Sequence, residues 1–308
     1  MATHVVFGSG ATGLTVARLL VERGENVNVV SRSGRTVDGA DGLAGDVTDQ
    51  AFANRATAGA NVAYQVLNAP YSRWAEDFPP LQHAVVEAAS LAGARLVTLE
   101  NCYLYGDTHG EPMTEATPIQ PTSRKGEVRA AMTEDLFAAY REGRVEATVG
   151  RASDYYGPGG GSQSMIGDRV VPQALAGKTA SVIGDPDQPH SYTYLPDIAR
   201  GLIELGERPE AVGRAWHLPT APALTMREIA GLVFREAGTE PKLRSAPRTM
   251  LWLLGVFNAD VRELREMLYE FEQPFVVDSS AFERTFGIAP TPMAQGIAET
   301  VDSYRKKE

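Results

Sequence analysis

The fold is decided by the stretch HVVFGSGATG, residues 4–13, which is followed by LTVARLL, residues 14–20. A short apolar run leads into a G-x-G-x-x-G turn and then into apolar residues at helical spacing. Gly8 permits the tight turn, Gly10 lets backbone N–H groups approach a pyrophosphate, and Gly13 allows close packing of helix on strand. The stretch therefore predicts a dinucleotide site formed by Gly8, Gly10, Ala11, Thr12 and Gly13.

The end of the second predicted strand indicates which dinucleotide binds. The run over 27–30 ends in Ser31 and Arg32, and no Asp or Glu stands there to accept a hydrogen bond from the ribose 2′-OH. Ser31, Arg32 and Arg35 can instead hold a 2′-phosphate, because a guanidinium binds phosphate through two parallel hydrogen bonds. We therefore predict NADP as the cofactor, with NAD possible. The alternative is that these arginines merely coat a surface loop.

Composition excludes several classes of protein. The chain has 308 residues with 29 Lys and Arg against 39 Asp and Glu, a net charge of −10. Nucleic-acid affinity depends on clustered cations, so we expect no nucleic-acid partner. The apolar run over 250–257 is shorter than the ~20 residues of a spanning helix, so we expect a buried or oligomer-facing helix and no membrane partner. A single cysteine, Cys102, excludes an internal disulfide, and with no apparent signal peptide we expect a cytoplasmic protein.

Predicted strands and helices alternate through the first half of the chain, which is typical of a parallel sheet. Six strands with helices on both faces predict an α/β, doubly wound Rossmann sheet, whose ligands lie beyond the carboxyl ends of the strands. The strands are predicted at 3–7, 26–31, 45–47, 61–67, 95–99 and 145–149. One helix is predicted after the glycine turn, to about residue 23, and a second in a segment that runs through Phe52. Two more are predicted at 71–92 and 122–142.

Beyond about residue 155, glycines and prolines interrupt short segments. We expect residues 1–155 to form the dinucleotide-binding domain, with sheet-completing segments from later in the chain. Residues 156–308 are expected to form mainly a smaller α/β substrate lobe that packs on the sheet and closes a cleft. Helices are predicted near 196–206, 226–237 and 260–272, the last with Val261, Leu264, Leu268 and Phe271 at helical spacing.

Further motifs follow the glycine turn along nearly the whole chain. They are Gly45-Asp46-Val47, Tyr105-Gly106, and the segments 151–159, 194–199, 216–219 and 278–280. With these motifs the chain resembles the extended or atypical short-chain dehydrogenases/reductases, the NAD-dependent epimerase/dehydratase family. The resemblance implies that Asp46 and Val47 flank the adenine, and that Asn68 and Ala69 lie beside the nicotinamide ribose.

The chain departs from the family at its catalytic tyrosine. The Tyr-x-x-x-Lys pattern would end at Lys125, which puts Pro121 at the tyrosine position, and Asn101 stands at the position of the catalytic Ser/Thr. Cys102 and Tyr103 fall on the acid and base positions of dehydratase relatives. We therefore predict Tyr103 as the replacement acid/base, with Lys125 binding the nicotinamide ribose and lowering the tyrosine pKa. Asn101 is predicted to hydrogen-bond the substrate oxygen.

Each of these residues also has a structural interpretation. Tyrosines near a strand end often pack with one hydrogen bond, which applies to Tyr103 and Tyr105 alike. Lys125 can belong to a solvated helix face with Arg124 and Arg129. Cys102 can be a small buried hydrophobic residue.

Substrate contacts are predicted from the loops after the later strands. Besides Cys102, the candidates are Asp154, Tyr155 and Tyr156 after the sixth strand, and His190 in the second lobe. The five histidines lack metal-ligand spacing, so no metal is expected. There is no G-x-S-x-G motif of the hydrolases either.

Three functions remain open. The first is an NADP-dependent oxidoreductase that transfers a hydride between the cofactor and a small carbonyl or alcohol, sugar-like or a secondary metabolite. The second is an NAD(P)-dependent sugar epimerase or dehydratase, although a dehydratase needs an acidic pair and only Glu100 is near. The third is a non-catalytic NADP-binding regulator, which has no need of a substrate lobe. The resemblance to the extended members of the family implies a homodimer through helices like those predicted at 71–92 and 122–142.

Overall fold

A computed structural model describes residues 1–246 and 265–306. The chain divides into two compact units that alternate along the sequence. The first comprises Met1–Leu104, Arg124–Ala152 and Ile198–Leu218, and the second comprises Tyr105–Ser123, Ser153–Asp197 and Pro219–Glu308. The apolar helix predicted over 250–257 lies outside the described residues, as do Val261 and Leu264.

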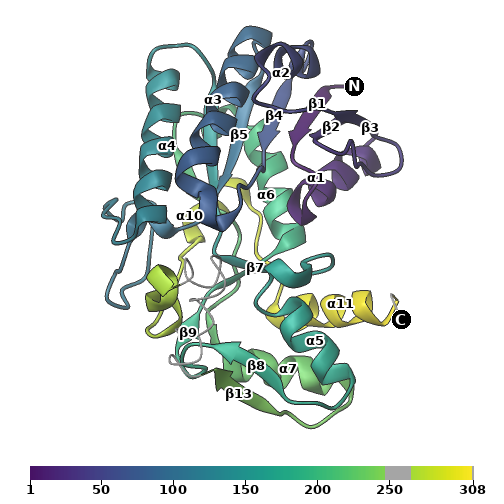
Figure 1. Ribbon diagram of the computed structural model, residues 1–308, viewed down its shortest axis with the longest axis vertical. Coiled ribbons are helices and arrows are strands. Elements are labelled where there is room, and N and C mark those ends of the chain that lie inside the picture. The colour runs from purple at the N-terminus through teal and green to yellow at the C-terminus, as the bar shows by residue number, and fades with distance from the viewer. Residues whose placement is uncertain (247–264, 307–308) are drawn as a thin grey trace. The chain divides into compact units, whose positions relative to one another are not determined.

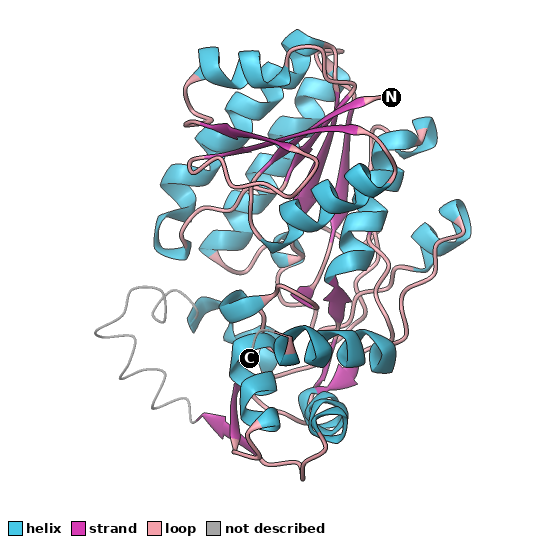
Figure 2. Ribbon diagram, turned by 90° about the vertical axis from the view of Figure 1, so that its right-hand side faces the viewer, coloured by secondary structure: helices cyan, strands magenta, loops and turns pink. Residues whose placement is uncertain are grey.

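The first unit is built on a seven-stranded sheet in the order β11-β6-β5-β4-β1-β2-β3, with every neighbouring pair parallel. Figure 2 shows the strands of this sheet in magenta with cyan helices packed around them. Its inner strands are mostly buried and mainly apolar, as expected for a sheet covered on both faces. The predicted doubly wound Rossmann sheet is confirmed. The strands are β1 (Thr3–Phe7), β2 (Asn26–Ser31), β3 (Asp41–Ala44), β4 (Val62–Gln65), β5 (Arg95–Glu100), β6 (Ala147–Arg151) and β11 (Ala215–His217).

Helices cover both faces of this sheet (Figure 1). They are α1 (Ala11–Glu22), α2 (Gln50–Thr57), α3 (Trp74–Ala92), α4 (Arg124–Arg141) and α6 (Leu195–Glu207), with short 3₁₀ turns η1 (Tyr71–Arg73), η2 (Tyr103–Tyr105) and η4 (Pro209–Ala211). Helix α3 packs against both α2 and α4. Val5 and Ala63 point to the core beneath these three helices, whereas Tyr64, the next residue along β4, meets Gly206 of α6. The alternation of side chains along the strands therefore separates two packed layers.

Two strand predictions were wrong in detail. The third strand is Asp41–Ala44, and the predicted 45–47 stretch follows it, because β3 is short, largely exposed and carries no apolar pattern. Seven strands form the sheet where six were predicted along the first half of the chain, since β11 comes from the later Trp-His segment and pairs with β6.

The described part of the second unit combines three strand pairs with helices. The pairs are β7 (Asp154–Tyr156) with β10 (Tyr192–Tyr194), β8 (Ala180–Ile183) with β13 (Leu243–Ala246), and β9 (Pro189–His190) with β12 (Leu224–Thr225). The helical elements are η3 (Gly161–Gln163), α5 (Gly167–Leu175), α7 (Met226–Ala237), η5 (Arg265–Phe271), α10 (Ser280–Phe286) and α11 (Met293–Arg305). The predicted α-helix over 260–272 is wrong where it is described, because residues 265–271 form a 3₁₀ helix.

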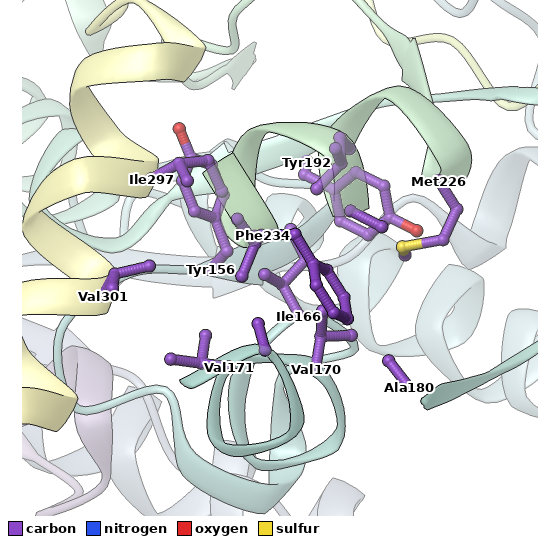
Figure 3. Packing of buried hydrophobic residues seen from close by; sticks show 14 of the residues in the cluster. Tyr156, Ile166, Val170, Val171, Ala180, Tyr192, Met226, Phe234, Ile297 and Val301 are labelled. Atoms are coloured by element: carbon purple, nitrogen blue, oxygen red, sulfur yellow. The ribbon is translucent and has the colours of Figure 1, made fainter. Parts of the chain in front are cut away.

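The core of this unit lies where α5, α7 and α11 meet (Figure 3). Val170 of α5, Phe234 of α7 and Val301 of α11 are all fully buried there, together with Tyr156 and Tyr192. Helices α5, α7 and α11 thus bury their apolar faces against one another. Among the described helices, none is long and apolar enough to cross a membrane.

Candidate active site

The glycine turn follows β1 and leads into α1. Gly8 has a positive φ of 120°, and a Cβ on Gly13 would lie 1.9 Å from the Gly8 carbonyl oxygen. No atom lies within 4 Å of a Cβ built on Gly10, and no side chain caps the start of α1. Gly13 is thus required by packing, whereas Gly10 leaves open space in front of the helix N-terminus. Because the first turn also carries no acidic residue, the turn fits a pyrophosphate.

The loop after β2 holds the residues predicted to contact the adenosine ribose. The buried Ser31 hydroxyl has no hydrogen-bond partner among the described residues. Arg32 and Arg35 are exposed. Hydrogen bonds from Thr48, and more weakly the charge of Arg32, hold the pKa of Asp46 below its ordinary value. Ser31, Arg32 and Asp46 therefore share one polar region at the carboxyl end of β2, with the buried Val47 beside Asp46.

Trp74 fixes the loop after β4. Its indole N–H donates to the Asn68 side-chain oxygen at 3.0 Å and to the Ala69 carbonyl oxygen at 3.0 Å. The two residues predicted to lie beside the nicotinamide ribose are therefore held by a buried ring, a partner that the sequence analysis missed.

Tyr103 meets a second phenol. The hydroxyl oxygens of Tyr71 and Tyr103 are 2.5 Å apart, and the Lys125 ammonium lies 4.9 Å from the centre of the Tyr71 ring. The Asn101 side-chain oxygen accepts the backbone N–H of Tyr103 at 3.4 Å. The structure thus brings the three predicted catalytic residues Asn101, Tyr103 and Lys125 into one neighbourhood through Tyr71. Sequence reasoning placed Tyr71 only inside a predicted helix.

Lys125 and Arg129 do not belong to a solvated helix face. They are 2% and 4% exposed, whereas Arg124 is exposed. The Arg129 guanidinium lies 4.5 Å from the centre of the Phe78 ring and 5.1 Å from that of Trp74. Burial lowers the pKa of Arg129. Helix α4 therefore presents two buried cations, one turn apart, to the aromatic side chains of η1 and α3.

Glu100 is occupied by a buried ion pair. One of its carboxylate oxygens lies 3.2 Å from the Arg151 guanidinium, and the other accepts the Thr133 hydroxyl at 2.8 Å. Cys102 is 1% exposed and directs its thiol to the Ala152 carbonyl oxygen at 3.7 Å. Packing therefore holds the Cys102 thiol in the interior, and its predicted substrate contact stays a prediction.

In the second unit the structure joins two predicted substrate contacts. The His190 Nε2 atom lies 3.2 Å from an Asp154 carboxylate oxygen, and Nδ1 lies 3.0 Å from the Glu270 carbonyl oxygen. The His190 ring stacks with those of Phe271 and Phe275, at centroid distances of 5.2 and 5.1 Å. Burial, and secondarily Asp154, raises the pKa of the Glu270 carboxyl well above its ordinary value. Sequence reasoning missed Glu270, which carried no motif.

Two neighbouring tyrosines have different roles. The Tyr155 hydroxyl donates to Gln163 at 3.0 Å, and burial raises the pKa of Tyr155 to about 12. Tyr156 is fully buried and its ring packs against Tyr194 at 5.2 Å. Tyr156 therefore lies in the core of the second unit (Figure 3), and its predicted substrate contact stays a prediction.

A parallel doubly wound sheet, with an open glycine turn at the start of its first helix, defines a Rossmann-type dinucleotide-binding protein. The model of the NAD dependent epimerase/dehydratase family matches residues 5–218. The chain belongs to that family.

Relatives within the family are distant. The chain is 24% identical over 224 residues to a dTDP-glucose 4,6-dehydratase of Streptomyces griseus, a match that covers 72% of this chain and 62% of the dehydratase. It is 24% identical over 234 residues to a UDP-glucose 4-epimerase of Mycolicibacterium smegmatis, covering 72% of this chain and 66% of the epimerase. The chain thus matches less than two thirds of the length of either relative.

Solved structures share the fold over the whole chain. One is MoeE5 in complex with UDP-glucose and NAD, with a TM-score of 0.80, 19% identity and 99% of both chains covered. Another is DesIV, a dTDP-glucose 4,6-dehydratase from Streptomyces venezuelae with NAD and TYD bound, with a TM-score of 0.80, 20% identity, and 99% of this chain and 97% of DesIV covered.

Proposed function

We propose that this protein is a nicotinamide-dependent enzyme that oxidises and re-reduces one carbon of a nucleotide-linked sugar, as an epimerase does. Membership of the epimerase/dehydratase family supports the cofactor chemistry, and the names of the matched relatives favour a nucleotide sugar. The observation that carries the proposal is the Tyr71–Tyr103 contact beside Lys125. It supplies phenol chemistry next to the sheet edge where this fold binds its ligands.

Each residue has a role in that chemistry. The bound dinucleotide supplies the hydride acceptor and donor. Gly8, Gly10 and Gly13 hold its pyrophosphate, and Lys125 holds the nicotinamide ribose. The Asn101 side chain orients the substrate hydroxyl. Tyr103 takes the hydroxyl proton as the carbon is oxidised and returns it on re-reduction.

Epimerisation is favoured over dehydration by the state of two side chains. Dehydration requires an acid and a base near the sugar carbon that loses water. Glu100 is buried against Arg151 and Thr133, and Cys102 is buried against Ala152. Of Glu100, Cys102 and Tyr103 at the end of β5, only Tyr103 is then left to exchange a proton with substrate. One such group is sufficient for oxidation and re-reduction at a single carbon.

The experiment that tests this function uses catalytic amounts of cofactor. The protein is incubated with UDP-glucose or dTDP-glucose and substoichiometric NAD⁺ or NADP⁺, and the sugar is followed by NMR. A new diastereomer without net formation of reduced cofactor is expected. A 4-keto-6-deoxy sugar indicates a dehydratase instead. If the protein binds the cofactor tightly but converts neither sugar, the result supports a non-catalytic NADP-binding regulator.

A net reductase is the second candidate. The chain is 26% identical over 187 residues to a dTDP-4-dehydro-6-deoxy-D-allose reductase of Streptomyces sp, which covers 48% of that protein. Steady oxidation of NADPH in the presence of a keto-sugar, in stoichiometric amounts, supports this function over epimerisation.

The cofactor is proposed to be NADP. Arg32 and Arg35 are exposed beside the orphan Ser31 hydroxyl, and no hydrogen bond or ion pair engages either guanidinium within the described part of the chain. Arg32→Ala is expected to weaken NADPH binding about tenfold to hundredfold and NADH binding little, since it removes a charge-assisted contact to phosphate. Fluorescence titration checks this, with exposed Arg18→Ala on α1 as the control. Equal losses for both cofactors contradict the assignment.

A homodimer through α3 and α4 is part of the proposal. Leu91 of α3 is 72% exposed and would contribute apolar area to such an interface. Light scattering coupled to size exclusion measures the mass directly.

A further inference from the structure

The Tyr71 hydroxyl contacts that of Tyr103, the proposed acid/base. Tyr71 lies in η1, immediately after the loop from β4, while Tyr103 follows β5. Strands β4 and β5 are hydrogen-bonded neighbours and run in parallel, so the residues beyond their carboxyl ends emerge at the same sheet edge. This topology explains why two phenols far apart in the sequence come within 2.5 Å of each other.

We propose that Tyr71 and Tyr103 act as one proton-sharing pair, in which Tyr71 positions Tyr103 and donates a hydrogen bond to its oxygen when that oxygen is negatively charged. The proposal rests on the proposed function. Pro121, at the position where the family resemblance expects a tyrosine, carries no hydroxyl and cannot act as an acid or a base.

The proton balance of the pair is simple. Before oxidation, Tyr103 is a phenolate and Tyr71 donates to it. The substrate hydroxyl then gives its proton to the Tyr103 oxygen, so one O–H bond breaks and another forms, while the hydride leaves the carbon for the cofactor. Tyr71 keeps its own proton throughout. The reverse transfer restores the phenolate when the carbonyl is reduced.

Aromatic packing fixes the orientation of the pair. The ring of Trp74 lies 5.4 Å from that of Tyr71 and 5.9 Å from that of Tyr103, and Trp74 is anchored by its two indole hydrogen bonds. Both phenol rings thus pack against the same buried, hydrogen-bonded indole ring. A preorganised donor of this kind avoids the cost of reorienting when charge develops.

The charges around the pair favour an anion. Lys125 lies over the Tyr71 ring, and buried Arg129 interacts electrostatically with both phenols. The facing groups from β5 and β6 are Glu100 and Arg151, which pair with each other. Lys125 and Arg129 are therefore the cations that a phenolate at this pair would meet in a poorly solvated region.

The test compares Tyr71→Phe, Tyr103→Phe and the double variant with Tyr140→Phe. Tyr140 is a partly buried tyrosine farther along α4, where its ring faces Gly213, so its variant controls for loss of a phenol hydroxyl in the same unit. Tyr103→Phe is expected to lower kcat by about 10²–10⁴-fold, the usual contribution of a general acid–base group. Tyr71→Phe is expected to lower kcat about tenfold to hundredfold, as loss of a hydrogen bond to a charged group does.

A purely structural Tyr71 predicts a different result. For the pair, Tyr71→Phe leaves KM and cofactor affinity within about threefold and moves the pH at which kcat reaches half its maximum upward by about one to two units. Adding Tyr71→Phe to Tyr103→Phe causes little further loss, because the two act as a unit. Unchanged kcat, or a loss expressed only in KM, overturns the proposal.

A spectroscopic titration separates this proposal from the proposed function. Phenolate absorbance near 295 nm is followed against pH for the protein without substrate. The wild type and Tyr140→Phe are expected to show a tyrosine ionising below the usual pKa of about 10, and Tyr71→Phe and Tyr103→Phe are each expected to lose it. Titration curves for Tyr71→Phe that match Tyr140→Phe overturn the pair, even if sugar conversion is confirmed. If the titration curves are as expected but no nucleotide sugar is converted, the tyrosine pair is retained and the proposed epimerase function is overturned.

Discussion

Replacing Glu100 by glutamine removes the negative charge beside two buried guanidiniums. The side chains of Glu100 and Arg151 are 0% and 4% exposed, and their closest atoms are 3.2 Å apart. Arg129 is also buried, and Glu100 is the largest charge opposing the burial that lowers the pKa of Arg129. The substitution keeps the shape of the side chain and can keep the Thr133 hydrogen bond, but it leaves the cations without their anion.

The expected loss is large for a single substitution. Breaking a buried ion pair by removing one partner costs about 3–5 kcal/mol, because the remaining charge stays desolvated. Since Gln can still accept the Thr133 hydroxyl, we expect the free energy of unfolding to fall by about 3 kcal/mol. Domains are stable by only about 5–15 kcal/mol, so a loss of this size shifts the urea midpoint clearly.

The matched control is Glu87→Gln. Glu87 pairs with Arg144 at 2.8 Å, but the side chains are 40% and 42% exposed, so the expected loss is at most about 1 kcal/mol. Urea unfolding followed by circular dichroism measures both variants. If Glu100→Gln loses no more than Glu87→Gln, the burial argument is refuted. If the folded Glu100→Gln protein also keeps wild-type turnover, Glu100 is structural. A folded but inactive variant would indicate a catalytic role for Glu100.

Two further predictions concern the glycine turn and a buried acid. Gly13→Ala places a methyl group 1.9 Å from the Gly8 carbonyl oxygen and is expected to cost about 1–3 kcal/mol of folding stability as well as cofactor affinity, whereas Gly10→Ala should lose only cofactor affinity. Thermal melts with NADPH titration check this, and equal melting losses contradict it. The raised pKa of Glu270 means that the folded state keeps a proton that the unfolded state releases above about pH 4.5, so its contribution to stability is lost as pH rises. The urea midpoint of Glu270→Gln should equal that of the wild type at pH 4 and exceed it at pH 8, because glutamine has no proton to lose. A difference in midpoint that does not change with pH argues against this.

Local patterns predicted the parts of the fold that local chemistry determines. The glycine turn and the first strand and helix were found because each is encoded within a few neighbouring residues. Strand β3 was misplaced because its residues are exposed and carry no alternation, so only pairing with β2 defines it. The sequence predicted that later segments complete the sheet but did not identify β11 as one of them, because its partner β6 lies far away along the chain. Pairing between distant segments leaves no local period to detect.

The candidate active site shows the same limit at the level of side chains. Lys125 and Arg129 are four residues apart and so share one face of α4, which by itself suggests a solvated surface. Tyr71, Trp74 and Phe78 recur at spacings of three and four, which by themselves suggest an ordinary apolar core stripe. Helix α3 packs against α4. Lys125 and Arg129 of α4 therefore lie over the aromatic rings at 71, 74 and 78. A desolvated cation beside a phenol changes the chemistry of both, so the catalytic potential of this site arises from two unremarkable patterns that only the tertiary fold brings together.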